Sequence, residues 1–245
     1  MSKHLDNQLG DTWRELTMNR PDCRNALSHE LIADLTAAIQ QASSDKNVRS
    51  MILTGTPPSF CAGLDLREVT AADTAHDISP LLTLLKTLED VPKPVIAAVN
   101  GPAMAGGAVL VAACDLAICA ESASIGYPGV RRGLVAPILM TYLCRQVGER
   151  HARYLLLTGL TVDARQALTM GLVNEVVADR ELMTRARRLA AHFAKLPASA
   201  LAQAKAMFTQ RHDQSAAGTD ILSGSNTELP LSSDSRAELK EFLES

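Results

Sequence analysis

One stretch of the chain combines glycines and apolar residues in a way that could stabilise negative charge through the backbone. Five apolar residues, Val95–Val99, predict a buried strand. After a turn at 100–102, Gly106 and Gly107 begin an apolar run that predicts a buried helix reaching Ala113. The first turn of a helix directs unpaired N–H groups and the positive end of its dipole at one point. Because glycine lets a ligand approach the backbone closely, this turn is a candidate anion site.

The same turn has a structural alternative, a tight connection between a strand and a helix in an α/β core. The lack of a Lys-Ser or Lys-Thr pair after the glycines argues against a phosphate loop, and the absence of Gly-x-Gly-x-x-Gly argues against a dinucleotide site. An oxyanion site stays open, and it requires a second N–H donor from elsewhere in the chain.

The composition predicts one large α/β domain, or such a domain with a small appendage. The 245 residues are 47% hydrophobic and 21% charged, which is enough for a sizeable core. A net charge of −3 without a basic block argues against nucleic acid as a partner. The five cysteines lack metal-type spacing, so we expect free thiols in a reducing cytoplasm. No apolar run approaches the length of a membrane span or resembles a signal sequence.

Strand and helix patterns alternate as far as residue 177, and only helical patterns follow. This order predicts an α/β core over 1–177 and a helical C-terminal region over 178–245. We expect a hairpin over 8–18 and loops over 67–80 and 213–233. Further strands are expected at 48–54, 95–99, 116–119 and 172–177. Helices are expected from a cap at Ser28 and over 81–88, 106–113, 137–147 (stopped by Gly148), 150–157, 163–170, 180–196, 197–210 and 236–243.

Several segments form a set that spans nearly the whole chain. They are N-R-P-D-C-R-N-A-L-S (19–28), F-C-A-G-L-D-L (60–66), P-V-I-A-A-V-N-G-P-A-M-A-G-G (94–107), C-D-L-A-I-C-A (114–120), L-T-G-L-T-V-D-A-R-Q-A-L-T-M-G-L-V-N-E-V-V (157–177) and, more loosely, 232–243. In type and order they resemble the crotonase superfamily, also called the enoyl-CoA hydratase/isomerase family. The resemblance implies a spiral of ββα units and a helical C-terminal region that makes trimer contacts, often within a hexamer built as a dimer of trimers.

The resemblance also implies an acyl-CoA thioester as substrate, with no cofactor or metal besides the coenzyme A of that substrate. Family members stabilise an enolate or a tetrahedral oxyanion with two backbone N–H groups. By motif position these donors belong to Leu64 and Gly106. Removing one such donor typically costs a factor of about 10²–10³ in rate.

Other motif positions imply contacts with the coenzyme A part of the substrate. Arg24 matches a position that is often basic and lies near the phosphates. The segment 62–66, which includes Ala62, Asp65 and Leu66, would wrap the adenine end. Because Asp65 also precedes a helix start, we expect its carboxylate to play a structural part there rather than to act as a base.

The chain departs from the family pattern where hydratases carry two glutamates as general acid and base. Val109 stands three residues after the oxyanion glycine, and Gly129 follows the Gly-x-Pro turn. A third position that sometimes holds an aspartate is Pro137. None of these residues can carry a proton, and each missing acid–base group costs a factor of about 10²–10⁴ in rate. Efficient hydration by the usual mechanism is therefore not expected.

Other reactive residue types near the motifs are expected to be structural. Asp115 should anchor a strand, and Tyr127 and Tyr142 should be buried core residues. Cys61, within the oxyanion loop, should be an inert small hydrophobe.

Two further polar features lie near the predicted mouth of the site. Arg131 and Arg132 follow Gly129 and could hold a substrate carboxylate, but we expect a solvated basic pair. His76 is expected to be a surface histidine within the predicted loop over 67–80.

Two classes of function are compatible with this pattern. One is an acyl-CoA enzyme with altered chemistry. Decarboxylation of a malonyl-type thioester needs oxyanion stabilisation more than a base, and hydrolysis or isomerisation with an unusual base is also open. The alternative is a catalytically inactive acyl-CoA-binding or scaffold protein of the same fold. The retained oxyanion glycines favour the enzyme.

Overall fold

The structure is a computed structural model that describes residues 3–71, 76–134, 136–216, 228–229, 240–241 and 243–244. Within them, six strands form the central sheet, in which an antiparallel hairpin at one edge continues into parallel strands. In spatial order the strands are β1 (Leu5–Leu9), β2 (Trp13–Met18), β3 (Ser50–Gly55), β5 (Val95–Val99), β7 (Leu116–Ala120) and β10 (Glu175–Val177). The predicted hairpin is confirmed, with the N–H of Gly10 donating to the carbonyl of Trp13 in its turn.

A second, smaller sheet stands beside the first and gives the fold its spiral character. Its strands, in order, are β6 (Ala103–Met104), β8 (Ser124–Gly126) and β9 (Thr161–Asp163). After β5 the chain enters β6 and then a helix, after β7 it enters β8, and after β3 it reaches Cys61, which bridges to Ala103. This repetition of strand, strand and helix is the expected spiral of ββα units.

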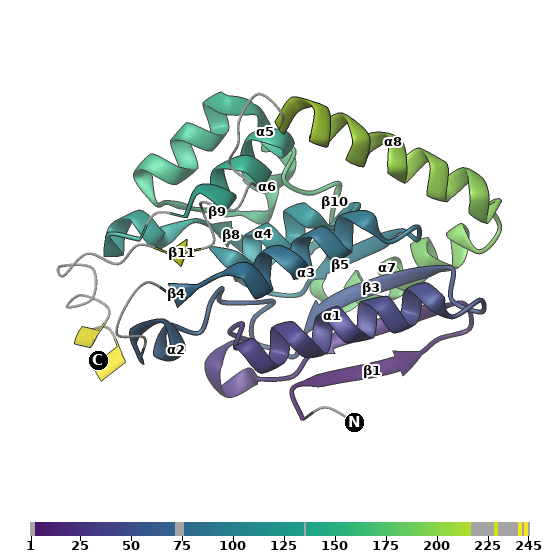
Figure 1. Cartoon of the computed structure of the whole chain (residues 1–245), viewed down its shortest axis with the longest axis horizontal. Helices are drawn as coiled ribbons and strands as arrows, with labels where there is room; N and C mark the ends of the chain where they lie inside the picture. The colour runs from purple at the N-terminus through teal and green to yellow at the C-terminus, as the bar shows by residue number, and fades with distance from the viewer. Residues whose placement is uncertain are drawn as a thin grey trace.

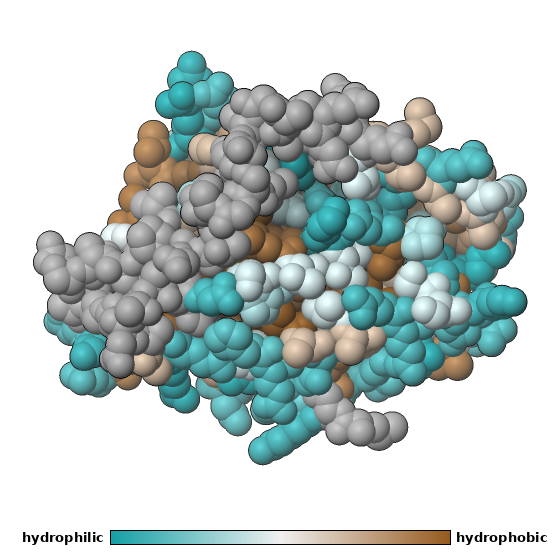
Figure 2. All heavy atoms as spheres, in the orientation of Figure 1, coloured by the Kyte–Doolittle hydropathy of each residue, from teal (hydrophilic) through white to brown (hydrophobic). Residues whose placement is uncertain are grey.

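Helices cover both faces of the central sheet (Figure 1). They are α1 (His29–Ser44), α2 (Leu66–Ala71), α3 (Ser79–Asp90), α4 (Gly106–Ala113), α5 (Pro137–Thr158), α6 (Ala164–Met170), α7 (Leu182–Phe193) and α8 (Ala198–Ala216), with short 3₁₀ turns η1 (Pro21–Cys23), η2 (Pro128–Arg132) and η3 (Asp179–Glu181). In α1 the predicted cap is confirmed, because the hydroxyl of Ser28 accepts the N–H of Leu31. The apolar face of α1 is buried, and Figure 2 shows hydrophilic atoms over much of its outer face.

Two predicted loops are partly wrong. Residues 67–80 include most of α2, the strand β4 (His76–Asp77) and the first turn of α3. The fully buried side chain of Val69 anchors α2, although a single apolar residue among polar ones gives no periodic signal. At the other end, α8 continues to Ala216, so residues 213–216 are helical. The short strand β11 (Glu228–Leu229) pairs with β4, and most of the helix expected over 236–243 lies outside the described residues.

The predicted helix stop at Gly148 is confirmed in the backbone. Its φ of 70° and ψ of 167° interrupt α5, so the helix changes direction there. All five cysteines are free thiols, as expected. In the part of the chain that the structure describes, no helix combines the length and apolar character that a bilayer span needs.

The helix α7 belongs to the core although it follows residue 177. It packs against β3, β5 and β7, and the hydroxyl of Ser50 donates to the carbonyl of Ala190 within it. Beyond it, α8 is fixed by Lys205, whose Nζ lies 2.7 Å from the carboxylate of Asp115. The division of the chain at residue 177 stays a prediction. In space, α7 packs with the α/β core although it lies in the predicted C-terminal region.

Close backbone contact between two segments joins the two sheets. The N–H of Met104 donates to the carbonyl oxygen of Cys61 at 2.9 Å, and the N–H of Cys61 donates to the carbonyl of Pro102. A Cβ atom on Gly107 would overlap that same Cys61 oxygen, and one on Gly101 would overlap the carbonyl oxygen of Pro58. Only glycine therefore allows the start of α4 to lie this close to the 58–63 segment.

We predict that Gly107→Ala lowers the free energy of unfolding by about 1–3 kcal/mol, the usual cost of overpacking. The added methyl group meets a fixed backbone oxygen, so the two segments must separate. The neighbouring Gly106→Ala is the matched control, because its Cβ would have nothing nearer than 3.4 Å. Urea denaturation of both variants measures the difference. Equal stability of the two variants would contradict this account of the contact.

Candidate active site

The two predicted donor groups lie on facing backbone segments. A Cβ on Gly106 would lie 3.5 Å from the nitrogen of Leu64, and a Cβ on Gly63 would lie 3.0 Å from the nitrogen of Gly106. Leu27 accepts the N–H of Asp65 and donates to the carbonyl of Gly63, so the N–H of Leu64 points to the opposite side of its extended strand. Among the backbone hydrogen bonds of the described residues, neither donor group has an acceptor. Both nitrogens lie along the contact between the two segments.

Each donor directly follows a residue with positive φ. Gly63 has φ of 93°, which glycine adopts without strain. Ala105 has φ of 47° and ψ of −113°, a conformation that costs a non-glycine residue about 1–3 kcal/mol. Its N–H donates to the carbonyl of Gly126 at 2.8 Å, which ties this strained residue to β8. No sequence signal indicates this strain, because alanine is not a residue that favours such a conformation.

A cavity of about 100 Å³ opens in front of the two donors. This is room for several water molecules or a short acyl group. Its walls come from the 62–66 segment, α2, α3, η2 and the start of α5, and they are largely aliphatic. The predicted residues that it brings together are Ala62, Leu64, Leu66, Gly106 and Gly129. Arg24, Asp65 and Val109 are not among the described residues that line it.

The two positions where hydratases carry glutamates differ in their surroundings. Gly129 lines the cavity, but a Cβ there would lie 2.8 Å from the carbonyl oxygen of Leu134, whose N–H donates back to the Gly129 carbonyl. Val109 is fully buried on α4, and Pro137 is the half-buried first residue of α5. None of the described residues that line the cavity carries a carboxylate.

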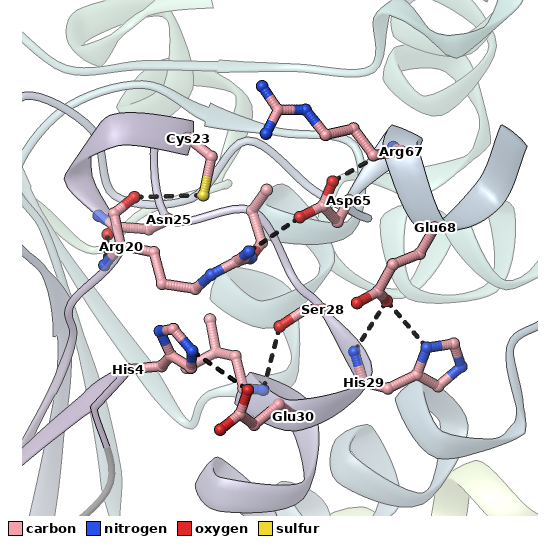
Figure 3. A network of polar contacts seen from close by, with 12 residues as sticks. His4, Arg20, Cys23, Asn25, Ser28, His29, Glu30, Asp65, Arg67 and Glu68 are labelled. Atoms are coloured by element: carbon pink, nitrogen blue, oxygen red, sulfur yellow. Dashed lines mark hydrogen bonds and ion pairs between the residues drawn. The ribbon is translucent and has the colours of Figure 1, made fainter. Parts of the chain in front are cut away.

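Asp65 is the helix-start carboxylate that the sequence predicted. It accepts the N–H of Arg67 in the first turn of α2 and pairs with the guanidinium of Arg20 at 3.0 Å (Figure 3). This buried pair fixes the end of the 62–66 segment against η1. The carboxylate therefore positions the loop.

Backbone groups around η1 hold the other end of this loop. The carbonyl of Arg24 accepts the N–H of Ala62 at 3.0 Å, while its side chain is exposed. The buried amide of Asn25 donates to the carbonyls of Thr56 and Ser59. Arg24 and Asn25 have φ of 55° and 56°, and this reversal lets η1 reach the loop. Asn25 stands within the N-A-L motif, but the sequence did not predict that its side chain positions this loop.

The other reactive residue types lie where the sequence predicted. Tyr127 and Tyr142 are buried, and burial raises the pKa of each phenol well above its usual range. Burial also raises the pKa of the Cys61 thiol to about 12, so the thiolate is scarce at neutral pH. Asp115 accepts the N–H of Val95 at 2.7 Å and thereby anchors β5.

The prediction of a solvated arginine pair is wrong for Arg132. Arg131 is exposed, but Arg132 is half-buried and lines the cavity. The two residues follow one another in a 3₁₀ turn, so their side chains leave in different directions. For His76 the structure describes the backbone within β4, and its side chain lies outside the described residues.

Comparison with known proteins shows which proteins this chain resembles in sequence and in fold. A family model described as enoyl-CoA hydratase/isomerase matches residues 11–245. A putative enoyl-CoA hydratase of Thermus thermophilus is 41% identical over 184 residues, covering 73% of each chain. Among solved structures, an enoyl-CoA hydratase from Mycobacterium smegmatis superposes with a TM-score of 0.79 at 33% identity over 100% of both chains. A monofunctional enoyl-CoA isomerase from M. smegmatis gives 0.76 at 28% identity, covering 86% of this chain and 95% of that one. The chain belongs to the enoyl-CoA hydratase/isomerase family, the crotonase superfamily.

Proposed function

We propose that the protein is an enzyme that binds an acyl-CoA thioester and stabilises negative charge on the thioester carbonyl oxygen. The observation that carries this proposal is the pair of N–H groups of Leu64 and Gly106, which line one cavity and have no backbone acceptor within the described part of the chain. Two preorganised donors in a water-poor site stabilise an oxyanion more than its neutral precursor. The backbone of Arg24 is hydrogen-bonded to the same loop, and its exposed side chain carries a guanidinium, a group suited to the phosphates of coenzyme A.

The proposed chemistry relies on oxyanion stabilisation rather than on two carboxylates acting on water. Decarboxylation of a malonyl-type thioester fits, because the electron pair of the breaking C–C bond passes to an enolate that the donors stabilise. Thioester hydrolysis or isomerisation with a base outside the two usual positions is also compatible. The second candidate is an inactive acyl-CoA-binding or scaffold protein, which is favoured by the lack of carboxylates among the described residues that line the cavity.

We also propose that the protein assembles as a trimer or as a dimer of trimers. Large apolar side chains remain exposed within the 154–168 segment, namely Tyr154, Leu157, Leu160 and Leu168. Leu157 is 72% exposed. Met207 and Phe208 on α8 are similarly exposed. A cluster of this kind in a soluble protein indicates a surface that a partner covers. A second copy of the chain is the partner that the family resemblance favours.

We predict that hydration of crotonyl-CoA is close to background. Val109 and Gly129 cannot transfer the protons that addition of water requires. The loss of absorbance of the conjugated thioester at high enzyme concentration measures the rate. A turnover above about 10 s⁻¹, a typical enzyme value, would refute this prediction.

We predict that Gly106→Pro weakens binding of a non-hydrolysable acetyl-CoA analogue at least about tenfold, while Gly106→Ala does not. Gly106 is the first residue of α4 and is not among the residues with positive φ, so proline fits the helix start but lacks the N–H. Titration calorimetry measures binding, and thermal unfolding shows that the variants are equally stable.

Alanine keeps the donor and is therefore the control for any effect of added volume. Equal weakening by proline and alanine would mean that this N–H does not contact the ligand. Lack of binding to the unmodified protein at millimolar analogue would refute the proposed function itself.

We predict that light scattering at micromolar concentration gives three or six times the 26.2 kDa mass of one chain. Leu157→Glu should shift the mass towards the single chain, because a charge would enter the covered surface. Leu9→Glu is the control, since Leu9 is 58% exposed on β1, far from α5 in Figure 1. A monomer in the unmodified protein, or equal dissociation by both substitutions, would contradict the assignment.

A further inference from the structure

We infer that Arg132 selects acyl-CoA thioesters whose acyl group ends in a carboxylate, an inference that rests on the proposed function. Among the described residues that line the cavity of Leu64 and Gly106, Arg132 is the only one with a charged side chain. The others are aliphatic residues, alanine, proline and glycine. A cavity with this lining offers an apolar path for methylene groups and one cationic group at which an anionic end can be bound.

The placement of Arg132 is specific to its position in η2. It is the last residue of that turn, three residues after Gly129, and it is half-buried. The adjacent Arg131 faces elsewhere, because a Cβ on Gly159 would lie 3.0 Å from the Arg131 Cγ. Gly159 is the C-cap of α5, and neither it nor Arg131 is among the described residues that line the cavity. The two neighbouring cations therefore differ in access to the substrate.

A carboxylate is the acyl substituent that this environment recognises best. The guanidinium has five N–H donors in a planar fork, so it can bind a carboxylate with two parallel hydrogen bonds while keeping donors for other partners. Aliphatic walls lower the local dielectric constant and strengthen the attraction between the opposite charges. A hydrogen bond to a charged group is worth about 1.5–3 kcal/mol, which corresponds to a preference of about tenfold or more.

The same interaction defines what Arg132 does in the reaction. A carboxylate held by a guanidinium is stabilised before the reaction begins, which opposes its loss as carbon dioxide. The carboxylate at Arg132 is therefore retained in the product and serves for recognition. Any bond that breaks lies nearer the thioester carbonyl, beside Leu64 and Gly106. Arg132 is thus a specificity residue, distinct from the oxyanion donors.

Titration calorimetry with glutaryl-CoA and pentanoyl-CoA tests the inference, because the two acyl groups differ mainly in the terminal carboxylate. The unmodified protein should bind glutaryl-CoA at least about tenfold more tightly than pentanoyl-CoA. Arg132→Gln should abolish this preference and retain pentanoyl-CoA binding, which shows that the variant is folded. Arg132→Lys should keep part of the preference, because it retains the charge without the planar fork. Arg131→Gln, the matched control, should keep all of it.

Each other outcome overturns the inference. No preference in the unmodified protein, or a preference that survives Arg132→Gln, removes Arg132 from recognition. Equal losses in the Arg131 and Arg132 variants would mean that general charge attraction, rather than contact in the cavity, causes the preference. If the unmodified protein binds pentanoyl-CoA without a preference, only this inference fails. If it binds neither thioester, the proposed function fails as well.

Discussion

The close contact between the 58–63 segment and the start of α4 determines most of the architecture. Gly107 lies directly over the carbonyl oxygen of Cys61, and the same oxygen accepts the N–H of Met104. The contact joins the central sheet to the small sheet and brings the nitrogens of Leu64 and Gly106 to one side of a cavity. The placement of the two proposed oxyanion donors is therefore a direct consequence of how two backbone segments pack. No flexible side chain is needed to position them.

The opposite wall of the cavity is not constrained by this backbone contact. Its far wall is formed by η2 and the start of α5, and there the functional groups are side chains. Gly129 stands where the family resemblance implies a proton-carrying glutamate, and the carbonyl oxygen of Leu134 lies close to where a side chain would begin. Arg132, one turn later, places a cation in the same wall. A fold of this kind can keep its electrostatic platform while the opposite wall determines substrate and reaction.

The sequence predicted those features that rest on long periodic patterns or on family motifs. The hairpin, β3, β5, β7, α1, α4 and the break at Gly148 follow from apolar periodicity, turns and glycines. The strands β6, β8 and β9 have two or three residues each, too few for a period to appear, and they form only because neighbouring strands supply their hydrogen bonds. The different directions of Arg131 and Arg132 depend on the tertiary packing of η2. The positive φ of Ala105 accompanies its hydrogen bond to Gly126 of β8, a tertiary contact that no local pattern reveals.

Energetic arguments distinguish a turn that serves only packing from a turn that also binds a ligand. Packing accounts for glycine at 107, but it does not account for two N–H groups at an aliphatic cavity that have no backbone acceptor among the described residues. Nor does it account for Ala105, whose strain glycine would relieve. A single substitution of Ala105 by glycine would relieve that strain. The proposed function accounts for both features, because an anionic oxygen that accepts both N–H groups would return free energy on binding.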